Sequence, residues 1–514
     1  MHTILLTTLN ARYAHTALGL RYLYANMHEL QPMAKIVEFT MNEQIQSIAE
    51  DLLKYNPRII GIGVYIWNAA QCSELIQTLK KVSPQTIIVL GGPEAGHLPH
   101  RVDLSHADYI ISGEGEVAFY ELCKELLSPV HGELVEPSTL RQAQGERSPH
   151  FIKAPLPDLK SIHLPYSAYN DEDVAHRYIY VEASRGCPFE CEFCLSSIDE
   201  KVRNFPLDEL LEEFEVLWER GARSFKFIDR TFNLNMTFAN RILDFFLSKE
   251  PPYFAHFEVI PDHFPEVLKE KIARFPAGSL QLEIGIQTLD PLIAKGINRP
   301  LKVEKIYDNL RFLENETHAH MHLDLIVGLP GESIEGFGRN LDTLVSLTHS
   351  EIQIGILKNL SGTTLSRHDK AHGMIYSDTP PYDILQNDLL SFSQIQKMKR
   401  FARFWDIFYN SGSFNKTVPL LWNEGKVFDG FYAFSLWIYD QTLSTWKISL
   451  ERQIALIHAY LIERHDKEIV EAALMDDLSQ RPEKTIPFFL RQSAQEKKVK
   501  ETNTVTPKRQ AKRT

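Results

Sequence analysis

The chain has 514 residues, long enough for two to four domains of ordinary size. Hydrophobic residues make up 44% and charged residues 24%, a balance that excludes wholesale disorder, and the net charge of -12 gives no general reason to expect nucleic acid as a partner. No apolar run approaches the roughly 18 residues that span a membrane, and the first residues lack the pattern of an export signal. We therefore expect a cytoplasmic protein.

The first 128 residues alternate short apolar runs with helical patterns such as 42–55 and 116–127. The apolar runs cover residues 3–8, 35–39, 59–64, 86–90 and 109–111. Strands that alternate with helices predict a parallel, doubly wound sheet. Such sheets bind ligands beyond the carboxyl ends of their strands. The candidate binding loops are therefore 9–19, 65–68, 91–96 and 113–116.

Residues 129–152 interrupt this alternation. The segment is polar, has no sustained period, and resembles a translated interspersed bacterial repeat. We expect it to be a disordered surface loop without function, because it has little apolar surface to bury. It lies in a linker that extends from residue 129 to residue 176.

A second alternating region covers residues 177–372. Its strand-like runs lie at 178–183, 225–228, 256–260, 280–286, 323–327 and 351–357, with helical patterns such as 208–220 between them. Six βα units predict a partial (β/α)6 barrel, in which the loops after the strands carry the catalytic residues. Residues 373–490 are mainly helical in pattern and rich in aromatic residues, which predicts a helical C-terminal domain.

The last segment, 491–514, carries eight Lys or Arg against two Glu. A basic tail can bind RNA through phosphate contacts, but this one lacks interleaved aromatic residues for base stacking. We favour a solvated, disordered tail, and nucleic acid is the less favoured partner.

Three of the five cysteines fall within eight residues: Cys187, Cys191 and Cys194. They directly follow the run at 178–183, and Gly186 lies beside the first of them. Three thiolates hold three irons of a 4Fe–4S cluster and leave the fourth iron open for a ligand. The alternative is zinc, but zinc sites usually pair two CxxC units, and no second pair at ligand spacing follows. The remaining cysteines stand alone on helical patterns, as small buried hydrophobes do.

The spacing of three and then two residues between the cysteines, with the aromatic Phe193 before the last, resembles the radical S-adenosylmethionine (SAM) superfamily. The resemblance covers residues 1–370 and is closest to the cobalamin-binding branch. It implies that SAM chelates the free iron. An electron from a low-potential donor such as flavodoxin or ferredoxin then cleaves SAM to methionine and a 5′-deoxyadenosyl radical. Cys187, Cys191 and Cys194 would then be both the metal ligands and the catalytic residues.

Several strand ends resemble the SAM-binding places of this family. Asp229 matches an acidic motif near the methionine end of SAM, although Arg230 replaces the usual second acid. Glu283 and Gln287 match the fourth-strand motif that reaches the ribose or the carboxylate. The alternative for both acids is a solvated position at a strand end.

The fifth and sixth strands of the second region end in small or apolar residues. The resemblance implies that Gly328 and Gly331 let the backbone approach the adenine of SAM, and that Ile356 lies beside it on the sixth strand. The alternative for the two glycines is an ordinary turn.

The first domain resembles the cobalamin-binding fold through Gly91-Gly92 and through Gly113-Glu114, which follow its fourth and fifth strands. Such glycines admit the corrin and its nucleotide tail close to the backbone. The usual axial-ligand motif Asp-x-His-x-x-Gly is absent. His15 is a candidate lower ligand, but we favour a hydrogen-bonding role for it. Tyr65 and Trp67 either stack on the corrin or fill its space.

Together these features predict a radical SAM enzyme that is dependent on cobalamin, for methyl transfer or rearrangement of an unknown substrate. One alternative is a cobalamin-independent radical SAM enzyme, such as a methylthiotransferase or an RNA-modifying enzyme. Another is a non-catalytic Fe–S sensor. The C-terminal helical region resembles a domain of unknown function found beside these two modules.

Overall fold

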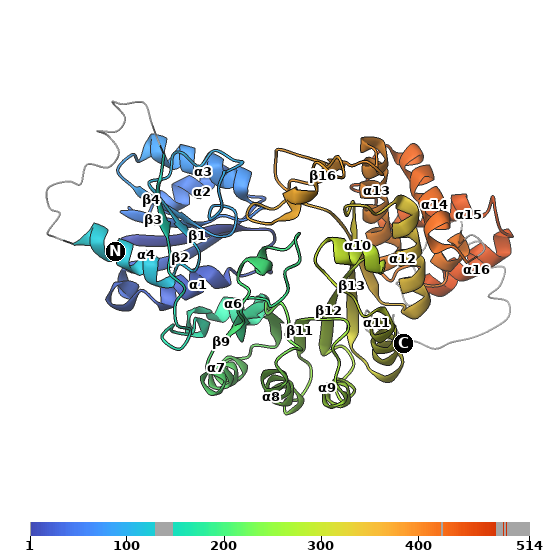
Figure 1. Cartoon of the computed structure of the whole chain (residues 1–514), viewed down its shortest axis with the longest axis horizontal. Coiled ribbons are helices and arrows are strands. Elements are labelled where there is room, and N and C mark those ends of the chain that lie inside the picture. The colour runs from blue at the N-terminus through green and yellow to red at the C-terminus, as the bar shows by residue number, and fades with distance from the viewer. Residues whose placement is uncertain (1, 129–147, 423–424, 480–486, 488–489, 491–514) are drawn as a thin grey trace. The chain divides into compact units, whose positions relative to one another are not determined.

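The computed structural model describes residues 2–128, 148–422, 425–479, 487 and 490. The chain divides into two compact units (Figure 1). The first unit comprises residues 1–258, 358–366 and 376–383, and the second comprises residues 259–357, 367–375 and 384–514. The expected disorder at 129–147 and in the tail at 491–514 falls outside the described residues.

A six-stranded parallel sheet forms the N-terminal domain in the first unit and confirms the predicted doubly wound fold. Its strands follow the order β2 (Ala34–Thr40), β1 (Ile4–Asn10), β3 (Ile59–Gly63), β4 (Ile87–Gly91), β5 (Tyr109–Ser112) and β6 (His150–Lys153). β1 is buried along its whole length. Because both of its faces are covered, this strand appears in the sequence as a largely continuous apolar run.

Helices cover both faces of this sheet (Figure 1). On one face α2 (Ile45–Leu53) and α3 (Ala69–Val82) pack through side chains such as Ile48 and Leu75. On the other face α1 (Leu18–Ala25) and α4 (Glu116–Leu127) pack through Leu20 and Phe119, and η1 (His28–Met33) follows α1. The sheet therefore has a separate apolar core on each side.

The expectation of a disordered loop over 129–152 is wrong at its C-terminal end. Residues 150–153 form β6, which pairs with β5 from Tyr109↔His150 to Ser112↔Lys153. β6 lies at the edge of the sheet, where backbone hydrogen bonds to β5 hold it. Side chains such as Phe151 are exposed, so burial imposes no regular apolar pattern on this part of the sequence.

The six predicted βα units supply a second parallel sheet. Its strands follow the order β7 (Ile179–Val181), β10 (Ser224–Phe227), β11 (Phe254–Val259), β12 (Leu280–Gln287), β13 (His320–Val327) and β14 (Glu351–Ile356). The intervening helices are α7 (Leu207–Glu219), α8 (Met236–Leu247), α9 (Glu266–Ile272), α10 (Pro291–Gly296), α11 (Val303–Glu316) and α12 (Ile334–Leu347). In the first unit, Phe225 and Phe227 of β10 pack on Phe214 and Phe246 of these helices.

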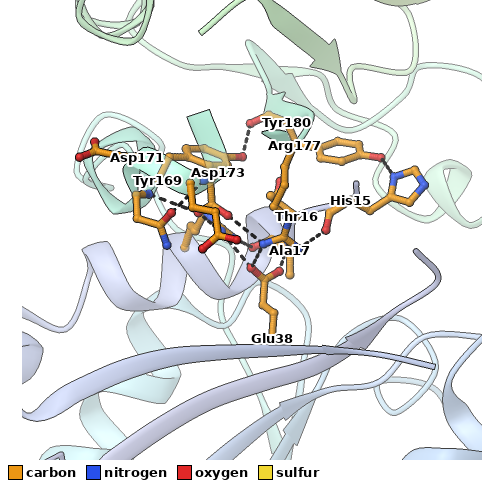
Figure 2. Close-up of polar contacts among 12 residues, drawn as sticks. His15, Thr16, Ala17, Glu38, Tyr169, Asp171, Asp173, Arg177 and Tyr180 are labelled. Atoms are coloured by element: carbon orange, nitrogen blue, oxygen red, sulfur yellow. Dashed lines mark hydrogen bonds and ion pairs between the residues drawn. The ribbon is translucent and has the colours of Figure 1, made fainter. Parts of the chain in front are cut away.

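Four buried charges fasten the linker to the first sheet. The linker contains η3 (Tyr166–Ala168) and α6 (Asp171–His176). Arg21 of α1 lies 2.9 Å from Glu38 of β2 and 2.7 Å from Asp173 of α6, and Arg177 repeats both contacts at 2.9 and 2.8 Å. Figure 2 shows Glu38, Asp173 and Arg177 turned toward one another. Two guanidinium groups face two carboxylates, so the positive and negative charges of the network balance.

The C-terminal region of the second unit is mainly helical, as predicted. Its helices are α13 (Phe392–Trp405), the π-helical turn η6 (Asp406–Asn410), η7 (Val418–Leu421), α14 (Val427–Thr442), α15 (Leu450–Leu461) and α16 (Lys467–Leu478). The aromatic side chains of Phe401, Trp405, Phe431 and Phe434 pack in its core. η5 (Leu365–His368) and the short strands β15 (Ile375–Tyr376) and β16 (Ile384–Gln386) precede these helices.

The π-helical turn closes one edge of the second sheet. β14 is the last strand in the sheet order, and the side chain of Asn410 pairs with its backbone. The Asn410 amide nitrogen donates to the carbonyl of Ile352 at 3.0 Å, and its oxygen accepts the N–H of Ile352 at 3.0 Å. No helix among the described residues is long and apolar enough to cross a membrane.

Candidate functional site

The three predicted cluster ligands share one loop of the first unit. β8 (Ser184–Arg185) and β9 (Arg203–Asn204) pair antiparallel and close the base of the loop, which also contains η4 (Leu195–Ile198). Gly186 has φ +91°, and a Cβ there would lie 2.3 Å from the carbonyl oxygen of Lys201. This backbone conformation of the loop therefore requires glycine at position 186.

The thiols of this loop fit a cluster held by three cysteines. Cys187 and Cys191 are buried, Cys194 is half-buried, and none of the three forms a disulfide. Among the described residues, no three His, Cys, Asp or Glu side chains gather as ligands of a single metal ion. Each thiolate of a cluster binds a different iron, so the donors need not converge on one point.

Asp229 fixes the strand end that leads into this loop. It is 3% exposed, and it accepts the N–H of Ala183 at 2.9 Å and the hydroxyl of Ser184 at 2.6 Å. Burial raises its pKa to about 7, although these hydrogen bonds act in the opposite direction. In the structure Asp229 therefore positions the cysteine loop, and the expected contact with the methionine end of SAM stays a prediction.

Arg185, two residues before Cys187, contacts three carboxylates. Its guanidinium lies 2.7 Å from Glu114, 2.7 Å from Glu116 and 2.8 Å from Glu182. Burial raises the pKa of Glu182, while Arg185 acts to lower it. The contacts with Glu114 and Glu116 join the loop after β5 of the first sheet to the base of the cysteine loop.

Arg203, on the opposite strand of the loop base, also bonds to Glu114, and it lies 3.0 Å from Asp199. Both arginines at the base of the cysteine loop thus share one carboxylate. The sequence analysis missed this clamp, because its partners are 71 and 89 positions apart and follow no local pattern.

A cavity of about 330 Å³ lies at the carboxyl ends of the first sheet. It brings together the predicted Gly91, Gly92, Gly113 and Glu114. Gly19, Gly115 and Glu116 of the predicted binding loops also line it. Residues outside those loops complete the lining: Gly61, Gly63, Tyr22 and Phe119, together with Glu182, Arg185 and Ile228 from around the second sheet. Gly61 and Gly63 carried a readable signal, because glycine inside a strand often marks a close approach.

The glycines of the cavity differ in what they do. A Cβ at Gly91 would meet one atom within contact range, the carbonyl oxygen of Ile111 at 3.9 Å, so this position keeps space open for a ligand. Gly92 has φ +96°, and its Cβ would lie 2.5 Å from the carbonyl of Val64. The backbone itself therefore requires Gly92, whereas the predicted close approach of a cofactor fits Gly91.

His15 lies outside the cavity lining. Its Nδ1 is 2.6 Å from the hydroxyl of Tyr180, and burial lowers its pKa (Figure 2). This contact agrees with a hydrogen-bonding role. Tyr65 does line the cavity and stacks on Trp67 with ring centroids 4.5 Å apart, so it forms a wall of the space.

The remaining predicted residues belong to the second unit. Gln287 ends β12 with φ +68°, whereas Glu283 lies four residues earlier, about 13 Å along the strand and away from the strand-end loops. Gly328 and Gly331 follow β13 with φ +94° and +80°, and Ile356 ends β14. Gln287, Gly328, Gly331 and Ile356 thus lie at or just beyond strand ends, where SAM is expected.

Glu332, in the loop after β13, was not predicted as a site residue. It is 2% exposed and accepts hydrogen bonds from Thr288 at 2.7 Å and from Asn340 at 2.9 Å. Burial raises its pKa to about 7. The residue ties the loop after β13 to the segment that follows β12.

A three-cysteine loop after the first strand of a six-stranded parallel sheet, beside a glycine-lined cavity, defines a radical SAM protein with a second cofactor domain. Residues 4–123 match the B12 binding domain, residues 181–344 match the radical SAM superfamily, and residues 370–514 match a protein of unknown function, DUF4080. The chain therefore combines a B12-binding domain, a radical SAM domain and a DUF4080 region. These matches agree with a 4Fe–4S cluster and SAM in the radical SAM region and with cobalamin in the B12-binding domain.

Two curated relatives are methyltransferases. The 2-(S-pantetheinyl)-carbapenam-3-carboxylate methyltransferase of Streptantibioticus cattleyicolor is 25% identical over 324 residues, 59% of this chain and 48% of that protein. The cobalamin-dependent radical SAM methyltransferase TokK of Streptomyces tokunonensis is 25% identical over 339 residues, 61% of this chain and 49% of that protein. The chain thus spans about half the length of these relatives.

The solved structure of the cobalamin-dependent SAM radical enzyme OxsB, with aqua-cobalamin and SAM bound, shares the fold. It matches with a TM-score of 0.60 at 15% identity and covers 97% of this chain and 81% of its own.

Proposed function

We propose that this chain is a cobalamin-dependent radical SAM methyltransferase that methylates an unreactive centre of its substrate. The main support for this proposal is the set of residues that line the cavity. Glu182, Arg185 and Ile228, which adjoin the cysteine loop, line the same cavity as the glycine loops of the B12-binding domain. A cofactor in this cavity lies beside the cluster loop, as a reaction that uses both cofactors requires. The names of the two methyltransferase relatives support the methyl-transfer outcome.

Each part of the site contributes a separate task. When bound, cobalamin supplies a methyl carrier, and SAM at the cluster supplies the radical. Cys187, Cys191 and Cys194 hold the cluster and leave one iron open. Asp229 and Arg185 orient the loop that carries these thiols, and the apolar cavity walls exclude water.

The cellular setting follows from the same chemistry. Cys187, Cys191 and Cys194 form no disulfide, and in a reducing compartment such as the cytoplasm thiols stay reduced. We propose a cytoplasmic enzyme that receives electrons from a low-potential donor such as flavodoxin or ferredoxin. The free iron and the electron requirement make the donor a necessary partner.

The test uses the full chain, reconstituted with iron and sulfide under anaerobic conditions. With hydroxocobalamin, SAM and dithionite it should bind cobalamin, form 5′-deoxyadenosine and convert SAM to S-adenosylhomocysteine. Cys191→Ala is the control and should form no 5′-deoxyadenosine. Production of 5′-deoxyadenosine without cobalamin binding would refute the methyltransferase in favour of a cobalamin-independent radical enzyme. Cobalamin binding without 5′-deoxyadenosine would refute the radical chemistry.

A further inference from the structure

Glu116, the first residue of α4, has one carboxylate oxygen that contacts Arg185 and one that has no hydrogen-bond partner. The side chain lines the cavity and the residue is 4% exposed. Its Oε1 lies 2.7 Å from Nη2 of Arg185, while Oε2 is buried and receives no hydrogen bond. A buried acceptor without a donor is costly, so such an oxygen in a cavity wall indicates a ligand that donates to it.

No neighbouring side chain donates to this oxygen, although the buried hydroxyl of Tyr22 in the same cavity wall and Nε of Arg203 also lack a partner. Arg185 directs Nε, Nη1 and Nη2 to Glu182 and Glu114. Arg203 directs its terminal nitrogens to Glu114, Asp199 and a backbone carbonyl. A donor carried by a molecule in the cavity would satisfy this oxygen.

The charge around Glu116 defines the chemical class of that donor. Three carboxylates, Glu114, Glu116 and Glu182, face the guanidinium groups of Arg185 and Arg203. Carboxylates outnumber guanidinium groups in this wall, and the free position is an acceptor, so it selects a ligand group that carries an N–H or O–H donor.

We propose that Glu116 binds the cofactor, and that its Oε2 accepts a hydrogen bond from a neutral N–H or O–H group of cobalamin. The donor is a peripheral amide of the corrin or a hydroxyl of the nucleotide tail. The inference rests on the proposed function, since it takes cobalamin as the occupant of the cavity. Because Oε1 contacts Arg185, Glu116 also links the occupant to the residue that begins the cysteine loop.

The experiment compares equilibrium binding of hydroxocobalamin to the full-length wild type and to Glu116→Gln. In this variant Arg185 retains the amide oxygen and turns the NH2 group toward the cavity, so a donor faces a donor. The affinity should fall about ten- to hundred-fold, the effect of losing a hydrogen bond to a charged acceptor. Glu121→Gln on the same helix is the control. Glu121 is exposed and does not line the cavity, so this variant should bind hydroxocobalamin as tightly as wild type.

Cobinamide, which lacks the nucleotide tail, separates the two sources of the donor. A loss of affinity for both hydroxocobalamin and cobinamide in Glu116→Gln assigns the bond to a corrin amide. A loss for hydroxocobalamin alone assigns it to the tail. Unchanged affinity for both ligands in a folded variant would overturn the inference.

A second variant keeps the inference testable if Glu116→Gln does not fold. Glu116→Asp retains the charge and withdraws the carboxylate by one methylene, so it should also weaken binding. Equal affinity of this variant and wild type would overturn the inference while the proposed function stands. A wild type that does not bind hydroxocobalamin would refute both.

Discussion

The buried network of Arg21, Glu38, Asp173 and Arg177 offers a sharp test of the energetics of the first unit. We consider the change Glu38→Gln, which removes one negative charge and leaves two guanidinium groups facing one carboxylate. Both arginines are nearly buried, so solvent cannot replace the missing charge. Removal of one partner from a buried ion pair typically costs about 3–5 kcal/mol.

The pKa of Glu38 gives an independent value for the free energy that this network contributes to folding. Burial alone would raise its pKa, but the guanidinium of Arg21, with help from Arg177, lowers it from 4.5 to about 2. That difference corresponds to about 3 kcal/mol in favour of the folded state. Because the pKa is lowered on folding, this stabilisation is present above pH 4.5 and is lost as the pH falls toward 2.

Hydrogen exchange measured on peptides that cover β2 and α1 reports the effect locally. A loss of about 3 kcal/mol should accelerate exchange through opening of this region roughly a hundred-fold at neutral pH. Glu50→Gln is the control, since Glu50 is exposed and its contact with Lys54 is 4.0 Å long; it should change the free energy of opening by less than about 0.5 kcal/mol. Similar exchange rates in Glu38→Gln and wild type would refute the assigned role of the network.

Three further predictions concern the cofactors. Anaerobically reconstituted wild type should contain about four irons per chain, and Cys191→Ala should lose most of them; stoichiometric zinc without acid-labile sulfide would contradict the cluster. Gly91→Leu should weaken hydroxocobalamin binding at an unchanged melting temperature, whereas Gly92→Ala should lower the melting temperature, because its Cβ meets backbone at 2.5 Å. His15→Ala should bind hydroxocobalamin as wild type does, and a selective loss of binding would make this histidine a cobalt ligand.

Much of the fold could be predicted because the interior strands are buried on both faces. The run at 59–64, for example, became β3 (Ile59–Gly63), which is buried at every position. β6 was not visible, because three of its four residues are exposed, Ile152 alone packs against a core, and backbone pairing with β5 holds the strand. Apolar patterns record burial, so they miss strands that are held by hydrogen bonds at an edge.

The candidate site was predictable where its chemistry is local in sequence. The cysteine spacing and the Gly91-Gly92 pair lie within single loops, so their geometry follows from a few neighbouring residues. The clamp between Arg185 and Glu114 joins residues that are 71 positions apart, and only the packing of two sheets brings them together. Glu283 lies within β12 and Gln287 ends it, and their contact with SAM stays a prediction because it depends on a ligand and not on the local sequence.

The side-chain cap that Asn410 places on β14 has a consequence for how the protein can be divided. It occupies backbone groups that an uncovered edge strand would offer to a second chain. A shortened protein that ends after β14, made to isolate the radical SAM module, would expose this edge and invite intermolecular strand pairing. In this respect the DUF4080 region shields an edge of the radical SAM sheet, and we expect the radical SAM module without it to aggregate.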